Sequence, residues 1–235
     1  MPHPRGLPFD RPVSPPRCLA PDTALGAPAI PSHGIDRRHF TRASMLLALL
    51  AAFAVGTFEV GFTLFGGQTL GLASTTMAAM FITCSLAMLA AQSMLLLPAV
   101  RRRINPRWVA ATFFGSALAL ALASLVPDAG SLGLLIAVVA TGIGMVGQGL
   151  SYELLERRPA ATGSLLGRQA AAGNLGQALG SVAAGSLFVL RPAAPFWLAA
   201  WVLLIGAAVA LVWWGPARQR ESVVRDTGSR HAHRP

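Results

Sequence analysis

Long apolar stretches joined by short polar connections occupy most of the chain from residue 43 onward. Six such stretches lie at about 43–66, 75–98, 108–127, 131–152, 164–190 and 194–214. A bilayer core of about 30 Å needs about 20 helical residues to cross it, and each stretch reaches that length. Lipid offers no hydrogen-bond partner to a free backbone group, so each stretch is expected to be helical. The pattern predicts an all-α integral membrane protein with six transmembrane helices.

The two ends of the chain have a different character from this apolar region. Residues 1–42 carry nine of the 17 prolines, a density at which neither helix nor sheet is expected. We predict that residues 1–42 are a disordered, Pro- and Arg-rich cytoplasmic tail. They lack the basic start and apolar core of a signal peptide. Residues 43–215 form the predicted six-helix domain, and residues 216–235 form a second, basic cytoplasmic tail.

The charges add an orientation to this picture. Charged residues make up only 12% of the chain, about half the share in soluble domains. All 19 basic residues are Arg, and 18 of them fall in the tails, in the loops after the second and fourth predicted helices, or just beyond. The positive-inside rule then predicts a multi-pass protein of the cell (inner) membrane with both termini in the cytoplasm. The net charge of +10 is therefore a topology signal, and we expect no nucleic-acid partner.

Glu59 is the one acidic residue well inside a predicted span. A charged side chain in a bilayer is costly, so Glu59 should face the bundle interior or a wet cavity. The functional interpretation is a carboxylate that couples transport to protons or contacts a substrate. The structural alternative is a Glu that hydrogen-bonds a neighbouring helix or points into the outer vestibule.

Two further predicted helices carry polar and small residues. The fourth has four glycines between residues 142 and 149, with Gln148 and Tyr152 as candidate cavity residues. The fifth is expected to pack tightly against another helix, because small residues and amides drive helix association in lipid. Its candidates for helix packing or for an interface between two halves are Gly167, Gly173, Asn174, Gly176, Gln177, Gly180 and Gly185. For both helices, ordinary packing within the bundle is the competing interpretation.

Residues 43–215 resemble the C-terminal half of a major facilitator superfamily transporter in the order of their segments, in the lengths of their loops and in local sequence. The strongest part is GSLLGR at residues 163–168 followed by GNLGQALG at residues 173–180, which looks like the family's eleventh helix. Four glycines follow the spacing of the family's antiporter motif, whereas Ser181 and Ala184 replace its Pro and Gly. A cytoplasmic basic loop resembles the family's loop motif in degenerate form, with Arg101, Arg102, Arg103 and Arg107. A positive-inside anchor explains these arginines equally well.

The resemblance implies a 3+3 inverted repeat. The first and fourth helices would line a central cavity, the second and fifth would face the other half, and the third and sixth would be peripheral. It also implies secondary active transport of an unknown small molecule by alternating access, with protons as a candidate coupling ion. The partner would be a second copy in a homodimer or a separately encoded N-terminal half, unless the chain is a fragment of a longer gene.

Two other functions are alternatives to transport. The first is a non-transporting membrane interaction protein, or a remnant of a longer transporter gene, in which the fifth helix serves assembly. The second is an intramembrane enzyme, which the predicted spans disfavour because they contain neither a His nor paired Asp residues. We therefore expect no catalytic residue, no metal site and no cofactor.

Overall fold

The computed structural model describes residues 34–101, 105–125, 128–157 and 162–214. These residues form helices and contain no strand, which confirms the all-α prediction for this part of the chain. The elements are α1 (Gly34–Leu64), η1 (Phe65–Thr69), α2 (Ser74–Met94), α3 (Pro98–Arg101), α4 (Pro106–Ala123), α5 (Ala129–Arg157), α6 (Thr162–Leu190), α7 (Ala194–Val209) and η3 (Ala210–Trp214). Both η segments are π-helical turns that continue the preceding helix.

Five helical segments of the described chain are long and apolar enough to cross a membrane. They are Phe40–Thr69, Ser74–Met94, Gly130–Leu155, Gly163–Leu190 and Ala194–Val212. The expected third span, 108–127, is shorter because α4 contains 18 residues, which corresponds to about 27 Å of helix. By length and composition the chain therefore fits a multi-pass membrane protein.

The first helix begins earlier than the sequence pattern predicted. We expected a non-helical tail up to residue 42, but α1 already starts at Gly34. The last proline of the tail is Pro31, so nothing in residues 34–42 removes a backbone donor from the helix. Residues 1–33 and 216–235, which hold the rest of the predicted tails, lie outside the described residues.

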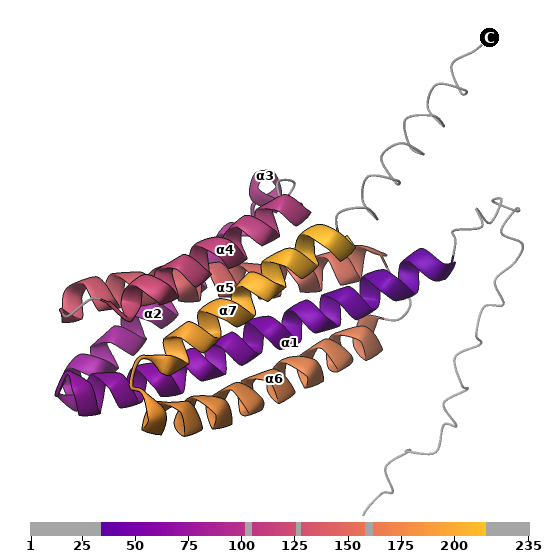
Figure 1. Ribbon diagram of the computed structural model, residues 1–235. Coiled ribbons are helices and arrows are strands. Elements are labelled where there is room, and N and C mark those ends of the chain that lie inside the picture. The colour runs from indigo at the N-terminus through magenta and orange to yellow at the C-terminus, as the bar shows by residue number, and fades with distance from the viewer. Residues whose placement is uncertain (1–33, 102–104, 126–127, 158–161, 215–235) are drawn as a thin grey trace, which may run out of the picture. The chain divides into compact units, whose positions relative to one another are not determined.

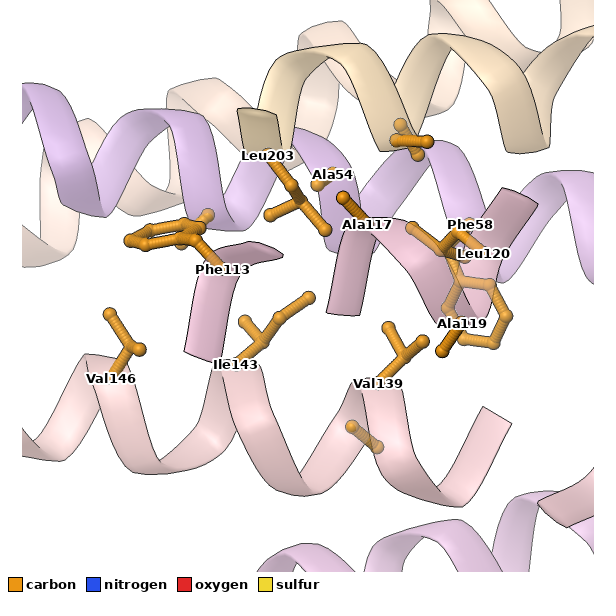
Figure 2. Close-up of a cluster of buried hydrophobic side chains, with 14 of the residues drawn as sticks. Ala54, Phe58, Phe113, Ala117, Ala119, Leu120, Val139, Ile143, Val146 and Leu203 are labelled. Atoms are coloured by element: carbon orange, nitrogen blue, oxygen red, sulfur yellow. The ribbon is translucent and has the colours of Figure 1, made fainter. Parts of the chain in front are cut away.

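The core lies between α1, α4, α5 and α7. Phe113 and Leu120 of α4 are fully buried beside Leu203 of α7 and Val139 of α5, and Figure 2 shows these side chains converging with Phe58 of α1. The cluster is apolar throughout. The buried polar side chains of the described residues lie at other positions: Ser44, Thr57, Ser116, Glu153 and Gln169.

The two remaining long helices are placed differently from these four. Helix α6 packs mainly on α1, and α2 packs mainly on α5 (Figure 1). Only 6% of the α2 span and 22% of the α6 span is buried, against 39–44% for the spans of α1, α5 and α7. Helices α2 and α6 thus present most of their surface to whatever surrounds the chain.

Local sequence signals explain where two helices begin. Asn105 precedes α4, and its side-chain oxygen accepts a hydrogen bond from the backbone N–H of Trp108 at 2.7 Å, with Pro106 next along the chain. Asp128 precedes α5 and accepts from the backbone N–H of Ser131 at 2.8 Å. Both are typical N-terminal caps. Asn105 and Asp128 therefore fix the first turns of α4 and α5.

Candidate functional site

Glu59 lies on a half-exposed face of α1 and is bound by a side chain from α6. The amide nitrogen of Gln177 donates a hydrogen bond to the Oε2 atom of Glu59 at 3.1 Å. Thr63, four residues after Glu59 and on the same face of α1, is exposed. The carboxylate is therefore held from one side and open on the other.

The backbones of α1 and α6 approach each other closely at three glycines. A Cβ atom at Gly176 would collide with the carbonyl oxygen of Leu49, and one at Gly180 would collide with that of Phe53. In the opposite direction, a Cβ atom at Gly56 of α1 would collide with the carbonyl oxygen of Gln177. A residue larger than glycine at any of these positions would push the two helices apart.

Two hydroxyl groups hold the same contact together. Thr57, which is fully buried, shares its hydroxyl hydrogen between the carbonyl of Phe53 at 2.8 Å and that of Gly180 at 3.2 Å. Ser181 of α6 donates to the carbonyl of Gln177 at 2.9 Å and lies 3.5 Å from that of Gly56. Ser181 thus bonds across the contact between α1 and α6, which we call the α1–α6 seam.

The seven α6 positions singled out from sequence divide between two surfaces. The backbone of α1 in the same chain already fills the space beside Gly176 and Gly180. These two glycines therefore cannot also pack against a second half of a transporter. A Cβ atom added at Gly173 would lie 3.9 Å from the Cβ atom of Ala52, which is an ordinary van der Waals contact. Asn174 is exposed, and added Cβ atoms at Gly167 and Gly185 would meet nothing within 4 Å.

The two α5 candidates, Gln148 and Tyr152, lie on a different helix from Glu59 and Gln177. Gln148 is exposed and follows Thr141 by seven residues, so both share one face of α5. Thr141 lines an open groove of about 370 Å³ between α4 and α5, together with Ser116. Tyr152 is half-buried, and next to it Ser151 donates to the Oε1 atom of Gln169 at 3.3 Å.

The basic loop is described only in part. Arg102 and Arg103 lie outside the described residues, Arg101 ends α3, and Arg107 is exposed in the first turn of α4. Among the described residues, no group of three or more His, Cys, Asp or Glu side chains is placed to hold a metal ion.

Sequence reasoning identified Glu59 and Gln177 separately but did not pair them, and it missed Gly56 and Thr57. The sequence did contain a signal for this helix contact, because a glycine and a threonine lie within one turn of Glu59 on an apolar helix. A comparison with models of protein families and one with curated proteins found no match to this chain. The case for function therefore depends on the geometry of the α1–α6 seam and on the resemblance described above.

Proposed function

We propose that the chain is half of a major facilitator-type secondary transporter that moves a small molecule by alternating access. It would cross the cytoplasmic membrane six times, with both termini in the cytoplasm. Helix α4, at about 27 Å, is close to the ~30 Å of a bilayer core and would supply the sixth crossing. The concentration of arginines on one side supports this orientation.

The pattern of helix packing supports a 3+3 inverted repeat. Exchanging α1, α2 and α4 for α5, α6 and α7 turns the packed pair α1–α6 into α5–α2, and α1–α7 into α5–α4, both of which also pack. The pairs α4–α7 and α1–α5 map onto themselves. Transporters built from such repeats place their sites between repeats or halves, near the middle of the membrane.

The observation that carries the proposal is the bond between Glu59 and Gln177 on a half-exposed surface. A carboxylate in a span is costly unless it faces water or a partner group, and Gln177 supplies only one hydrogen bond. The open side of the carboxylate leaves room for a proton or for a cationic or hydrogen-bonding group of a substrate. In this proposal Glu59 carries the proton or contacts the substrate, and Gln177 orients it.

The α1–α6 seam would determine which parts move. Close backbone contact at Gly56, Gly176 and Gly180 leaves no room for the two helices to slide past each other. Helices α1 and α6 would therefore change orientation as one body, and Glu59 would keep its Gln177 partner throughout the cycle.

The test is uptake into proteoliposomes under an imposed pH gradient. The probes are radiolabelled glucose, glutamate, lysine, lactate and tetraphenylphosphonium, each compared with protein-free liposomes. We expect at least one probe to accumulate and Glu59→Gln to lower its uptake on the order of a hundredfold, the low end for a lost proton-transfer group. Asp128→Asn is the matched control, because it makes the same change of carboxylate to amide outside the spans and should leave uptake unchanged.

The outcomes separate the two parts of the proposal. Uptake of no probe above the liposome background would contradict transport of these classes of molecule. Uptake by the wild type that is equalled by Glu59→Gln would leave transport standing and remove the role of Glu59.

A second candidate function is a non-transporting membrane interaction protein or a remnant of a longer transporter gene. The observation that favours it is the exposed surface of α6, where Gly167 and Gly185 have open space beside them, as expected of a helix that docks another helix. This function predicts stable assembly in membranes together with no uptake of any probe.

A further inference from the structure

The groove between α4 and α5 lies at the middle of both helices. Gly115 is at the midpoint of α4 (Pro106–Ala123), and Gly142 is next to the midpoint of α5 (Ala129–Arg157). The volume of about 370 Å³ is within the range of about 300–1,000 Å³ for small-molecule sites and far above the ~30 Å³ of one water molecule. The groove is therefore large enough for a small organic molecule at the depth of the lipid chains.

Two hydroxyl groups in this groove, those of Ser116 and Thr141, have no hydrogen-bond partner among the described residues. Helical Ser and Thr side chains can bond the carbonyl four residues earlier, as Thr112 of the same groove does to Trp108 at 2.9 Å. Ser116 makes no such bond although it is only 2% exposed. A buried hydroxyl without a partner costs free energy, so the groove suits an occupant that can hydrogen-bond.

The position of the Ser116 hydroxyl depends on a glycine of the facing helix. A Cβ atom at Gly142 would lie 2.5 Å from the Oγ atom of Ser116, so the hydroxyl occupies the space that the absent side chain leaves. Both residues line the groove, as Thr141 does beside Gly142. One hydroxyl from α4 and one from α5 thus belong to the same wall of the groove.

The rest of the lining indicates what the occupant is made of. The groove has no charged or amide side chain, and Ala137 and Val138 line it beside the glycines. An ionised group would therefore have no counter-charge there, and a lipid chain has no group that could bond the two hydroxyls. Val138 is 49% exposed, so the groove is open on its outer side.

We infer that this groove binds a neutral, lipid-soluble molecule that carries a hydroxyl or carbonyl group on a small hydrocarbon body. Ser116 and Thr141 bond the polar group, since a hydroxyl both donates and accepts. The hydrocarbon body lies along Gly115, where an added Cβ would meet nothing within 4 Å. This site goes beyond the proposed transport, because it lies on other helices than Glu59 and its occupation does not depend on uptake.

Photolabelling in native membranes tests the site with a matched pair of probes. The first is a phenyl trifluoromethyl diazirine that carries a benzyl alcohol, and the second has a methyl group in place of the alcohol. Mass spectrometry of peptides measures labelling of the groove relative to the exposed Leu86 and Leu89 of α2. We expect this ratio to be on the order of tenfold higher for the alcohol probe, the scale of one or two hydrogen bonds.

Two kinds of variant separate the hydroxyls from the space. Ser116→Ala with Thr141→Val removes both hydroxyls and should lower the ratio for the alcohol probe to that of the methyl probe. Gly115→Leu keeps both hydroxyls but fills the groove, and it should lower labelling of the groove by both probes. The matched control is Ser93→Ala with Thr83→Val on α2, where both hydroxyls bond carbonyls of their own helix and labelling of the groove should not change.

Three results would overturn the inference. Equal ratios for the two probes would show that lipid chains fill the groove, and labelling by neither probe would show that another helix covers it. A ratio that survives the loss of both hydroxyls would show that they hold no ligand. Labelling of α2 and circular dichroism report whether each variant is folded, and the comparison of the two probes on the wild-type chain does not depend on any variant.

Discussion

The α1–α6 and α2–α5 pairs both use glycine, but in opposite ways. In the α1–α6 seam, an added Cβ at Gly180 or Gly176 would meet a backbone carbonyl of the other helix. Between α2 and α5, an added Cβ at Gly144 would meet the flexible side chain of Met88, with its Cγ atom at 2.6 Å, and Gly133 faces the end of Met80 at 3.7 Å. The first contact joins backbone to backbone, and the second joins side chain to backbone.

The difference shows which contact can adjust. A carbonyl oxygen moves only if its whole helix moves, whereas methionine has three rotatable bonds and fills irregular gaps. The α1–α6 seam should therefore be rigid and intolerant of change, while the α2–α5 contact can repack. The candidate site, Glu59 with Gln177, is built on the rigid pair.

The largest effect is expected from Gly180→Ala in the α1–α6 seam. The new methyl group would displace the carbonyl of Phe53, and we expect the free energy of unfolding to fall by about 2–3 kcal/mol, as for other overpacked sites. Denaturation in mixed micelles, followed by circular dichroism, measures it. The matched control is Gly147→Ala, where an added Cβ meets nothing within 4 Å and stability should rise by up to about 1 kcal/mol. Equal effects of the two substitutions would contradict the comparison.

A smaller effect is expected from Gly144→Ala in the α2–α5 contact. Met88 can rotate away from the new methyl group, so we expect a loss of about 1 kcal/mol, at the low end for overpacking. In a Met88→Ala background the same substitution should cost nothing, because the colliding side chain is gone. This coupling is measured as a double-mutant cycle. A loss at Gly144 as large as that at Gly180, or one independent of Met88, would show that the second contact is as rigid as the first.

The hydroxyl group of Thr57 should contribute less than the glycines of the same seam. Thr57→Val keeps the shape but removes the hydrogen bond to the Gly180 carbonyl, and we expect a loss of about 0.6–1 kcal/mol, typical of such bonds in membranes. Thr83→Val on α2 is the control, because the Thr83 hydroxyl bonds only to Ala79 of its own helix. The same micelle denaturation compares the two variants, and a loss at Thr83 that matched the one at Thr57 would remove the interhelical contribution.

The smallest effect concerns the first turn of α5. Hydrogen bonds from Ser131 hold the pKa of the exposed Asp128 carboxyl below its usual value of 3.8. A carboxyl whose pKa is lowered in the folded state stabilises that state at a pH above its unfolded pKa, and this contribution is lost as the pH falls through the folded pKa. We expect amide hydrogen exchange at the start of α5 to be faster in Asp128→Ala than in the wild type at pH 7, and the two rates to converge as the pH falls below the folded pKa of Asp128. An unchanged exchange rate at pH 7 would contradict the cap.

The hydrophobic pattern predicted the long helices well, because in lipid a span must be both apolar and helical. Five of the six predicted stretches correspond to helices long enough to cross a membrane, while the stretch at 108–127 gives the shorter α4. The predicted start of the first helix was wrong, because the proline-rich tail was taken to continue past Pro31 to residue 42, although residues 32–42 contain no proline.

The candidate site was only partly predictable. Glu59 stood out because a lone acid in an apolar helix has few structural explanations, and Gln177 stood out as an amide among small residues. Their contact depends on how α1 and α6 turn toward each other, which no local pattern encodes. The same rotation determines which α6 glycines pack against α1, as Gly176 and Gly180 do, and which have open space beside them, as Gly167 and Gly185 do.

The central claim is that α1 and α6 form one packed unit that carries Glu59 and Gln177. The most direct measurement is a disulfide between Ala52→Cys and Gly173→Cys, in the Cys18→Ser and Cys84→Ala background. An added Cβ at Gly173 lies 3.9 Å from that of Ala52, inside the range of about 3.5–4.5 Å for a disulfide. We expect oxidation to form this bond within one chain, detected by mass spectrometry of peptides, and uptake of the transported probe to stay unchanged. A pair that does not crosslink, or uptake that is lost on oxidation and restored on reduction, would contradict it.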